Sequence, residues 1–410
     1  MNKKPKVILF LYNRLFDPLI QSNFWLYIKD YLEEENNPYH FHLVTYENTE
    51  FPLTSEQLAL VEKWKSQGLG WSTLTWHQGS GLKQKFIDLF NGFRQVVKLR
   101  FKGYKHIVTL GSIAGTYAYT YSIPLRLRLF LYQFEPHSEY AIDNKMWAAN
   151  SKQYKISHYL EKKAANSAKV IASGTVFMQQ RVKDVWKSKA EFFRIPTVAN
   201  DKKFIFNNDD RLEIRKQYNI GMDKWVLYYP GKFGDLYYKE EFAWMYKWLK
   251  EEEPRLHLLI VTPHTDEEVK VLFDGAAVSS EDYTIAHCDY VDIHKYASAS
   301  DFAIISVPPG PSKKFISNIK VGEYLCAGMP FLITKGISED YIYATEKDVG
   351  VVVGDFVKKD IKKAWPEIKE YLDRDPESLR QHCRNVGLDY RGFDNLNNKF
   401  KEAINSLASF

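Results

Sequence analysis

The stretch SKKFISNIKVGEYLCAGMP, residues 312–330, joins a loop rich in lysine, hydroxyl and amide side chains to an apolar helix that ends at Gly328-Met329-Pro330. A helix N-terminus favours anions because its first backbone N–H groups are free and the helix dipole is positive there. One turn into this helix, Glu323 offers two carboxylate oxygens that can accept hydrogen bonds from a pair of hydroxyl groups. The stretch therefore predicts a site for a diphosphate that is attached to a ribose.

On both sides of this stretch, short apolar runs alternate with longer charged segments of helical periodicity. Five runs lie early in the chain and five lie late, at residues 7–12, 40–46, 106–111, 127–134 and 169–173, and at residues 224–231, 255–263, 301–308, 330–336 and 349–354. Continuous apolar runs are typical of parallel strands that are buried on both faces. We therefore predict an α/β chain with two Rossmann-like, doubly wound domains in tandem.

The chain of 410 residues is long enough to form two separate hydrophobic cores. We expect the boundary near residues 193–207, after the first series of strands. The predicted parts are a first domain over 1–195, a second domain over 196–376, and closing helices over 377–410. The aromatic residues of the closing segment are expected to pack back against the first domain; they are Tyr390, Phe393 and Phe400.

Composition and local motifs exclude several classes of protein. No window approaches the roughly 18 consecutive apolar residues of a membrane span, and the start of the chain lacks the cleavage site of a signal peptide. We therefore expect a cytoplasmic protein. The three cysteines are scattered and predict neither a disulfide framework nor a metal site. The turn at residues 12–24 lacks Gly-x-Gly-x-x-Gly, which argues against an NAD-dependent oxidoreductase.

Charge is divided unequally along the chain. Residues 1–195 contain 27 Lys and Arg against 16 Asp and Glu, whereas residues 196–410 contain 29 against 35. A basic first half suggests an anionic partner, and a membrane surface, a lipid phosphate or a nucleic acid would qualify; an incidental solvated face is the alternative. Residues 83–105 interleave basic and apolar side chains, as in a helix that lies on an anionic bilayer or one that packs on the sheet with a basic outer face. No nucleic-acid-binding motif is present, so nucleic acid is not an expected partner.

Four segments resemble the group 1 family of GT-B glycosyltransferases, which are retaining enzymes with two Rossmann-like domains facing each other across a cleft. They are FFRIPTVANDKKF (192–204), VLYYPGKFGD (226–235), YVDIHKYASASDFAIISVPP (290–309) and NIKVGEYLCAGMPFLIT (318–334). The resemblance covers most of the second domain and scattered points of the first. It implies that the second domain binds a nucleotide-sugar donor and that the first binds the acceptor.

The resemblance also assigns roles to residues of the second domain. Glu323 matches the second acid of the family's Glu, seven residues, Glu pattern, and would bind the ribose; the alternative is a glutamate that merely favours the helix dipole. Phe315 stands where the first acid is expected, so we expect a different contact to the sugar. Lys320 would stabilise charge on the leaving diphosphate, while Lys313 and Lys314 are interpreted as solvated. The donor-binding residues implied are Gly231, Lys232, Lys239, Tyr290, Val291, Ser312, Ser317, Asn318, Lys320 and Glu323.

In the first domain, YQFEPHSEYAIDN, residues 132–144, follows a predicted strand, so its polar side chains are expected at the carboxyl end of a sheet, where such folds bind ligands. Glu135, His137 and Glu139 place three titratable groups within five residues. The resemblance implies that His137 contacts the donor sugar, and we assign His137, Glu135 and Lys320 to catalysis. Metal ligation by this cluster is a rival interpretation, but no metal is expected. The acceptor-binding candidates are Glu139, Gln21 and Ser22.

These features predict a hexosyltransferase that moves a sugar, with retention, from a nucleotide sugar to a hydroxyl of a glycan or a lipid-linked acceptor in surface polysaccharide or glycoconjugate synthesis. If the reaction were inverting, Glu135, His137 or Glu139 would be the base. A non-enzymatic nucleotide-sugar binding protein and a sugar-nucleotide 2-epimerase are the alternatives. No cofactor is expected besides the donor, and the protein could lie peripherally on the inner face of the membrane. The sequence does not indicate which base and sugar the donor carries, or which acceptor receives the sugar.

Overall fold

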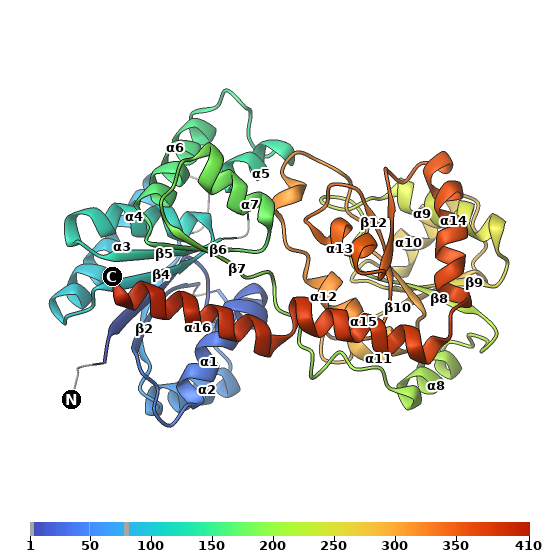
Figure 1. Cartoon of the computed structure of the whole chain (residues 1–410), viewed down its shortest axis with the longest axis horizontal. Coiled ribbons are helices and arrows are strands. Elements are labelled where there is room, and N and C mark those ends of the chain that lie inside the picture. Colours follow the sequence, from blue (N-terminus) through green and yellow to red (C-terminus); the bar gives the residue numbers. More distant parts are fainter. Residues whose placement is uncertain (1–3, 49, 78–81, 134) are drawn as a thin grey trace. The chain divides into compact units, whose positions relative to one another are not determined.

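The computed structural model describes residues 4–48, 50–77, 82–133 and 135–410 of the chain, whose elements are labelled in Figure 1. Spatial contacts divide it into two units, Met1–Pro196 with Leu396–Phe410 and Thr197–Asn395. The predicted closing segment 377–410 is thus divided between the units. Helix α15 (Pro376–Arg391) lies in the second unit, whereas α16 (Phe393–Ser409) lies almost entirely in the first.

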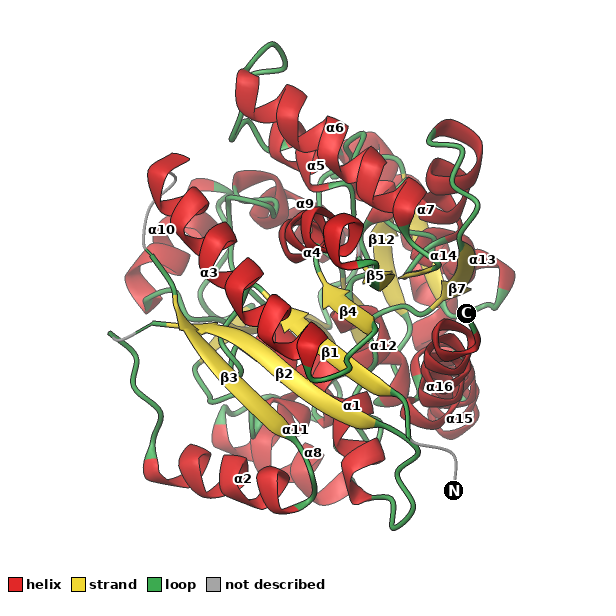
Figure 2. Ribbon diagram, turned by 90° about the vertical axis from the view of Figure 1, so that its left-hand side faces the viewer, coloured by secondary structure: helices red, strands yellow, loops and turns green. Residues whose placement is uncertain are grey.

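The first unit is built on a seven-stranded parallel sheet in the order β3-β2-β1-β4-β5-β6-β7. Its strands are β1 (Lys6–Leu11), β2 (His40–Glu47), β3 (Gly70–Thr75), β4 (His106–Leu110), β5 (Arg128–Tyr132), β6 (Val170–Ser173) and β7 (Glu191–Arg194). Its other helical elements are η1 (Ile20–Phe24), α1 (Trp25–Glu33), α2 (Ser55–Ser66), α3 (Leu82–Phe101), α4 (Ser112–Leu125), α5 (His137–Asp143), α6 (Lys152–Ser167), α7 (Val176–Gln180) and η2 (Arg181–Val185). Figure 2 shows α3 and α4 on one face of this sheet and α1 and α2 on the other.

The second unit contains a six-stranded parallel sheet in the order β10-β9-β8-β11-β12-β13. Its strands are β8 (Trp225–Pro230), β9 (Leu256–Val261), β10 (Tyr283–Ala286), β11 (Phe302–Ile304), β12 (Phe331–Thr334) and β13 (Gly350–Val353). Its other helical elements are α8 (Asn208–Gln217), α9 (Glu240–Glu252), α10 (Asp266–Gly275), α11 (Ile293–Ser298), η3 (Lys313–Phe315), α12 (Ile319–Cys326), α13 (Asp340–Glu346) and α14 (Lys358–Asp373). The strand order reverses between β8 and β11, and ligands bind outside the carboxyl ends of the strands at such a switch point.

Each face of the second sheet has its own apolar core. Val226 and Tyr228 of β8 pack into one core, which also contains most of the buried side chains of α12. Leu227 and Tyr229, which alternate with them, pack into the other core beneath α9 and α14. Both faces are therefore buried, which explains why the strands are continuous apolar runs in the sequence. The predicted two doubly wound α/β domains are confirmed.

All ten predicted runs contain a strand, but three strands have no counterpart among the predictions. They are β3, β7 and β10, and each forms an edge of its sheet. Most of their side chains are only partly buried. An edge strand covered on fewer sides needs no continuous apolar run, so its sequence, such as GWSTLT in β3, carries no strong signal.

The aromatic side chains of the closing helices also divide between the units. Phe400 on α16 stacks on Tyr27 at 4.7 Å and meets Phe24 edge-on at 5.9 Å, so it packs within the first unit as expected. Tyr390 on α15 instead stacks on Tyr343 of the second unit, with 3.7 Å between ring centroids. Among the described residues, no helix combines the length and apolar character that crossing a membrane requires.

Candidate functional site

The start of helix α12 lies beside the turn that follows β8, at the switch point of the second sheet. Gly231 follows β8 directly, and a Cβ atom at this position would lie only 2.5 Å from Nζ of Lys320. Any larger residue would displace the ammonium group. The glycine of the first turn and the lysine of the helix, predicted as partners, are therefore brought together.

Helix α12 presents its first residues in a fixed orientation. Asn318 is its N-cap, and Oδ1 of Asn318 accepts a hydrogen bond of 3.1 Å from the backbone N–H of Lys320. Nζ of Lys320 lies 4.7 Å from the ring centroid of Tyr237 and 5.4 Å from that of Tyr229. Among the described residues, this ammonium group has no hydrogen-bond or ion-pair partner. Burial lowers the pKa of Lys320 to about 8, although the nearby charge of Glu323 opposes that shift.

Glu323 lies one turn further along α12 and is buried. The hydroxyl group of Tyr290 donates a hydrogen bond of 2.7 Å to Oε1 of this carboxylate. Burial raises the pKa of Glu323, while the hydrogen bond from Tyr290 and the positive charges of Lys320 and Lys203 act in the opposite direction. The carboxylate predicted to bind a ribose is thus covered by a tyrosine in this structure.

Lys203 completes this cluster and was not a predicted site residue. Its ammonium group lies 4.0 Å from the ring centroid of Tyr290 and donates a hydrogen bond to the backbone oxygen of the same residue. Burial lowers the pKa of Lys203, and the charge of Glu323 opposes this shift. Lys203 lies within the segment 192–204 that carries the family resemblance, but nothing in its local sequence distinguishes it from Lys202.

Ser317, predicted to bind the donor, contributes its side chain to the scaffold under the site. Its Oγ accepts hydrogen bonds of 2.9 Å from the backbone N–H of Thr197 and 2.9 Å from Nη1 of Arg391. Arg391 is fully buried and forms an ion pair with Asp340, which is also fully buried. These contacts hold the residues at the start of the second unit against α12.

In the first unit, a buried carboxylate holds the helix that begins at His137. Glu161 on α6 accepts hydrogen bonds of 3.0 Å from the backbone N–H of Ser138 and 2.6 Å from its hydroxyl group. Burial raises the pKa of Glu161 to about 7, and the hydrogen bonds from Ser138 oppose this shift. Glu161 occupies the N-terminus of α5 and so restricts the position of His137. Because it lies 24 residues after His137 in a charged helical segment, sequence reasoning did not identify it.

The three titratable residues predicted at this loop have different surroundings. His137 packs edge-on against Trp147, with 5.5 Å between ring centroids, and burial lowers its pKa, which favours the neutral imidazole. Glu139 forms an ion pair with Arg181 and lies 3.8 Å from Nδ1 of His158. The backbone oxygen of Glu135 accepts a 3.0 Å hydrogen bond from Ser112. Within the described part of the chain, no three His, Cys, Asp or Glu side chains are placed to hold a metal ion.

Comparisons with known proteins identify the architecture. No protein-family model and no curated protein matches this chain in sequence. Similar solved structures include sucrose-phosphate synthase from Thermosynechococcus elongatus, with 14% identity, a TM-score of 0.71, and coverage of 99% of this chain and 100% of the other. HepE from Anabaena in complex with UDP has 12% identity, a TM-score of 0.67 and coverage of 98% and 100%. A glycosyltransferase from Rickettsia africae has 12% identity, a TM-score of 0.68 and coverage of 99% of both chains.

The chain has the GT-B fold.

The other predicted residues of the second GT-B domain lie around its switch point with different exposure. Lys232, Lys239 and Val291 are exposed, and Lys239 forms an ion pair of 3.3 Å with Glu240. Ser312 is buried, and so is Phe315 at the position of the expected acid. The interpretation of Lys313 as a solvated side chain is wrong, since it is 5% exposed; Lys314 is exposed.

The acceptor candidates of the first GT-B domain lie on η1, after the first strand. Nε2 of Gln21 donates a 2.8 Å hydrogen bond to the backbone oxygen of Leu15, and Oγ of Ser22 accepts one of 3.1 Å from Asn23. Both side chains therefore have local structural contacts. Their role in acceptor binding stays a prediction.

A polar cluster at the carboxyl end of β1 was not predicted. Asp88 on α3 is fully buried and accepts hydrogen bonds of 2.5 Å from the hydroxyl group of Tyr12 and 2.6 Å from Nδ1 of His77. Nζ of Lys85 donates a 3.0 Å hydrogen bond to the Tyr12 hydroxyl. The residues come from three separate segments, so no local sequence motif indicates that they lie together. Their position at the β1–β4 switch point places them where GT-B domains leave a crevice for ligands.

Helix α3 packs on the first domain, as one of the two interpretations of its sequence expected; contact with a bilayer stays a prediction. Val96 and Leu99 are buried against the rest of the first domain. Towards the other end of the helix, Phe86 is 66% exposed and Phe90 is 60% exposed. The helix thus packs on the sheet with one part of its surface and leaves aromatic side chains in the solvent with another.

Proposed function

We propose that the protein is a glycosyltransferase that moves a sugar from a nucleoside-diphosphate sugar to a hydroxyl group of its acceptor. The observation that carries this proposal is the pairing of Lys320 and Glu323 on successive turns of α12, beside Gly231 at a sheet switch point. A lysine suits a phosphate and a carboxylate suits the ribose hydroxyls. The structure of HepE with UDP, which shares the fold, supports a nucleotide of this class.

The chemistry requires the bond between the anomeric carbon and the diphosphate oxygen to break while a bond to the acceptor oxygen forms. Negative charge then develops on the departing diphosphate. Lys320 would stabilise this charge because its ammonium group has no competing partner among the described residues. The acceptor releases a proton in the same process. We propose a retaining reaction in which the acceptor approaches on the side of the leaving group, so that no dedicated nucleophile is needed.

His137 is the residue of the first unit that we place at the sugar. Its lowered pKa keeps the imidazole neutral near pH 7, so one ring nitrogen can accept and the other can donate a hydrogen bond. Glu139 is already paired with Arg181, which makes it a weaker candidate for a base. If the products showed inversion, His137 would be our candidate for the general base.

The acceptor is proposed to be a glycan or a lipid-linked sugar at an anionic membrane surface, as part of polysaccharide or glycoconjugate synthesis. The support is the exposed pair Phe86 and Phe90 on α3, together with the basic residues Lys83, Arg94 and Lys98 of the same helix. Flotation with liposomes tests this placement. Binding to anionic but not neutral vesicles, lost in the Phe86→Ser/Phe90→Ser variant, is the expected result; absence from both kinds of vesicle removes the idea.

A thermal-shift panel of nucleoside diphosphates and their sugars tests the donor proposal. A ligand at 100 times its Kd stabilises the folded state by about 2.7 kcal/mol and raises the melting temperature. We expect one base to be selected, and we expect its shift to disappear in Lys320→Met but not in the neighbouring, exposed control Lys314→Met. No shift with any nucleotide would contradict the proposal.

The same ligands distinguish the alternatives by turnover. Binding without transfer to any acceptor would support a nucleotide-sugar binding protein. Conversion of the donor sugar in the absence of an acceptor would support a 2-epimerase. Transfer of the sugar with retained anomeric configuration supports the proposed function.

A further inference from the structure

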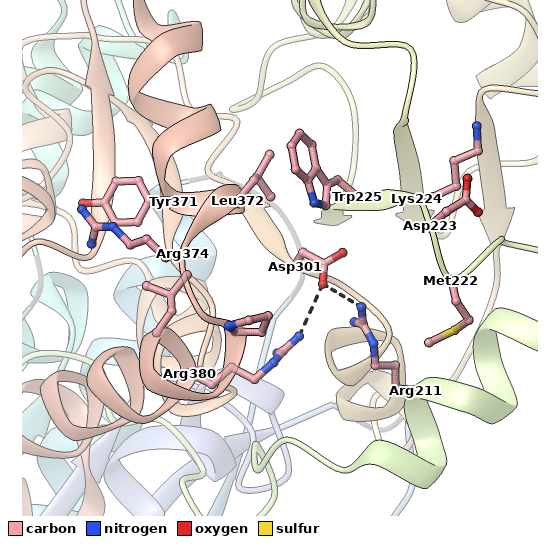
Figure 3. A pocket seen from close by; sticks show the side chains of 13 residues that line it. Arg211, Met222, Asp223, Lys224, Trp225, Asp301, Tyr371, Leu372, Arg374 and Arg380 are labelled. Atoms are coloured by element: carbon pink, nitrogen blue, oxygen red, sulfur yellow. Dashed lines mark hydrogen bonds and ion pairs between the residues drawn. The ribbon is translucent and has the colours of Figure 1, made fainter.

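A cavity of about 200 Å³ lies in the second unit at the amino ends of β8 and β11. Trp225 at the start of β8 and Asp301, just before β11, are among its lining residues (Figure 3). Lys320 and Gly231 belong to the carboxyl ends of the same strands. A six-residue strand spans about 20 Å, so this cavity is separate from the proposed donor site.

Three arginines converge on the single carboxylate of Asp301. Nη2 of Arg211 lies 2.9 Å from Oδ1, and Nη2 of Arg215 lies 2.8 Å from Oδ2. Nη2 of Arg380 lies 3.5 Å from Oδ1. Figure 3 shows the side chains of Arg211 and Arg380 reaching Asp301 from two different helices.

The positive charges around Asp301 exceed the negative ones. Lys224 and Asp223 also line the cavity, so four cations, including the three arginines, are grouped with two carboxylates. Arg374, another lining residue, is already paired with Asp348 at 2.7 Å and Glu370 at 2.9 Å. With Arg374 and its two acids included, five cations face four carboxylates, so one positive charge is left uncompensated in a partly buried place, and a bound anion would relieve it.

Arg215 is held through all of its donors, whereas Arg211 and Arg380 are held mainly through Nη2. Nη2 of Arg380 also donates a 3.0 Å hydrogen bond to the backbone oxygen of Ser300, and the guanidinium group of Arg380 lies 4.0 Å from the ring centroid of Phe206. Arg215 is fully buried and donates to the backbone oxygens of Ala299, Gly221 and Lys224 at 2.9, 3.1 and 3.1 Å. The bonds from Nη1 of Arg211 to backbone oxygens are long, at 3.4 and 3.5 Å. Nη1 of Arg380 is buried and has no hydrogen-bond partner among the described residues. Burial lowers the pKa of Arg380 to about 10, with the charge of Asp301 opposing and those of Arg211 and Arg215 adding to the shift.

The remaining wall of the cavity is largely apolar. Trp225, Leu372, Leu379 and Met222 lie opposite or beside the arginines, and Figure 3 shows Trp225 and Leu372 across the cavity from Arg380. A bare ion would leave these surfaces uncovered. A small molecule that carries a phosphate on a compact carbon skeleton would use both the charged and the apolar parts.

We propose that this cavity is a second ligand site, which binds a small phosphate-bearing molecule through Arg211 and Arg380. Guanidinium groups suit a phosphate because their N–H groups match its oxygens in pairs. A phosphate monoester such as a sugar phosphate would cover both parts of the cavity; inorganic phosphate shares the group that the arginines recognise and is the alternative that the test distinguishes.

Thermal shifts with inorganic phosphate and with glucose 6-phosphate, at constant ionic strength set by chloride, test this proposal. We expect both the wild type and the exposed control Lys270→Gln to be stabilised by at least one of these probes. In Arg211→Gln the concentration needed for half of the shift should rise at least tenfold, while the shift caused by nucleotide is retained. The probe that saturates at the lower concentration identifies the source of the phosphate.

Two results would overturn the proposal. One is the absence of a shift with both probes in the wild type. The other is a phosphate shift that is unchanged in Arg211→Gln and lost in Lys320→Met, because this would assign the phosphate to the donor site. If Arg211→Gln does not fold, Lys224→Gln, whose side chain is half-buried at the rim, replaces it with the same expectation.

Discussion

The charged side chains of α12 in the second unit have fewer polar partners than those around α5 in the first unit. In the second unit, Lys320 has no polar partner among the described residues, and Glu323 accepts a hydrogen bond only from Tyr290 within that same part of the chain. In the first unit, Glu139 is paired with Arg181 and Glu161 is bonded to Ser138. The charges of α12 therefore have few polar partners among the described residues, whereas those around α5 largely maintain the fold; this difference is what the proposed donor site requires.

The largest expected effect comes from removing the charge at the start of α12. In Lys320→Met, kcat/KM for the donor should fall by about 10²–10³-fold, as when one charge-stabilising group is lost from an active site. Stability should stay the same or rise, since a half-buried ammonium group without a hydrogen-bond or ion-pair partner among the described residues is replaced by an apolar side chain. Steady-state kinetics and thermal unfolding measure both, with Lys314→Met as the control. A variant that unfolds more easily and keeps its activity would show that Lys320 stabilises the fold and does not serve the reaction.

Glu161 should instead affect stability in a pH-dependent way. Its pKa is raised to about 7 in the folded protein, whereas about 4.3 is usual in an unfolded chain. The folded state therefore binds the proton more tightly, and this residue destabilises the fold increasingly as the pH rises from about 4.5 to 7. From pH 5 to pH 8, the free energy of unfolding of Glu161→Gln should improve by about 2 kcal/mol relative to the wild type.

Urea unfolding at both pH values measures this difference. Glu35→Gln, at an exposed position of the same unit, is the control and should follow the wild type at each pH. A constant difference between Glu161→Gln and the wild type across this pH range would show that Glu161 does not titrate there.

The pKa of Lys320 predicts a smaller effect on the activity. Because this pKa is lowered to about 8, the free protein loses the ammonium charge above that pH. The value of kcat/KM should then fall by about tenfold per pH unit beyond pH 8. In Lys320→Arg, the guanidinium group stays charged, so the decline should disappear even if the maximum is lower. An identical decline in both proteins would assign it to another group.

Tyr290→Phe is expected to give the smallest effect. The phenol occupies an oxygen of Glu323 that the ribose would use, and a single hydrogen bond contributes about 1 kcal/mol net. Its removal should therefore strengthen nucleotide binding by roughly fivefold in a calorimetric titration. Weaker binding would show that the Tyr290 hydroxyl contacts the nucleotide itself.

The fold, and the proximity of Lys320 and Glu323, could be predicted from local features of the sequence. Strands buried on both faces must be apolar throughout, so β8, β9 and their neighbours were visible as runs. Lys320 and Glu323 lie three residues apart in one helix, and a motif of adjacent residues places them together without knowledge of the tertiary structure. The edge strand β3 is only partly buried and therefore carried no such signal.

Contacts between distant segments could not be predicted in the same way. Lys203 reaches Tyr290 across 87 positions, and Asp88 reaches Tyr12 across 76. Nothing local to these residues distinguishes them from other charged side chains. The burial of Lys313 was missed for the same reason, because it depends on how the loop packs and not on its composition.

The role of Glu323 in recognising the ribose of a bound nucleotide can be measured directly. Calorimetry would compare the nucleoside diphosphate selected in the thermal-shift panel with its 2′,3′-dideoxy analogue, on the wild type and on Glu323→Gln. We expect the wild type to prefer the ribose form by at least about tenfold, or 1.4 kcal/mol, and we expect this preference to fall below about threefold in the variant. Equal preferences in the two proteins would contradict this role of Glu323.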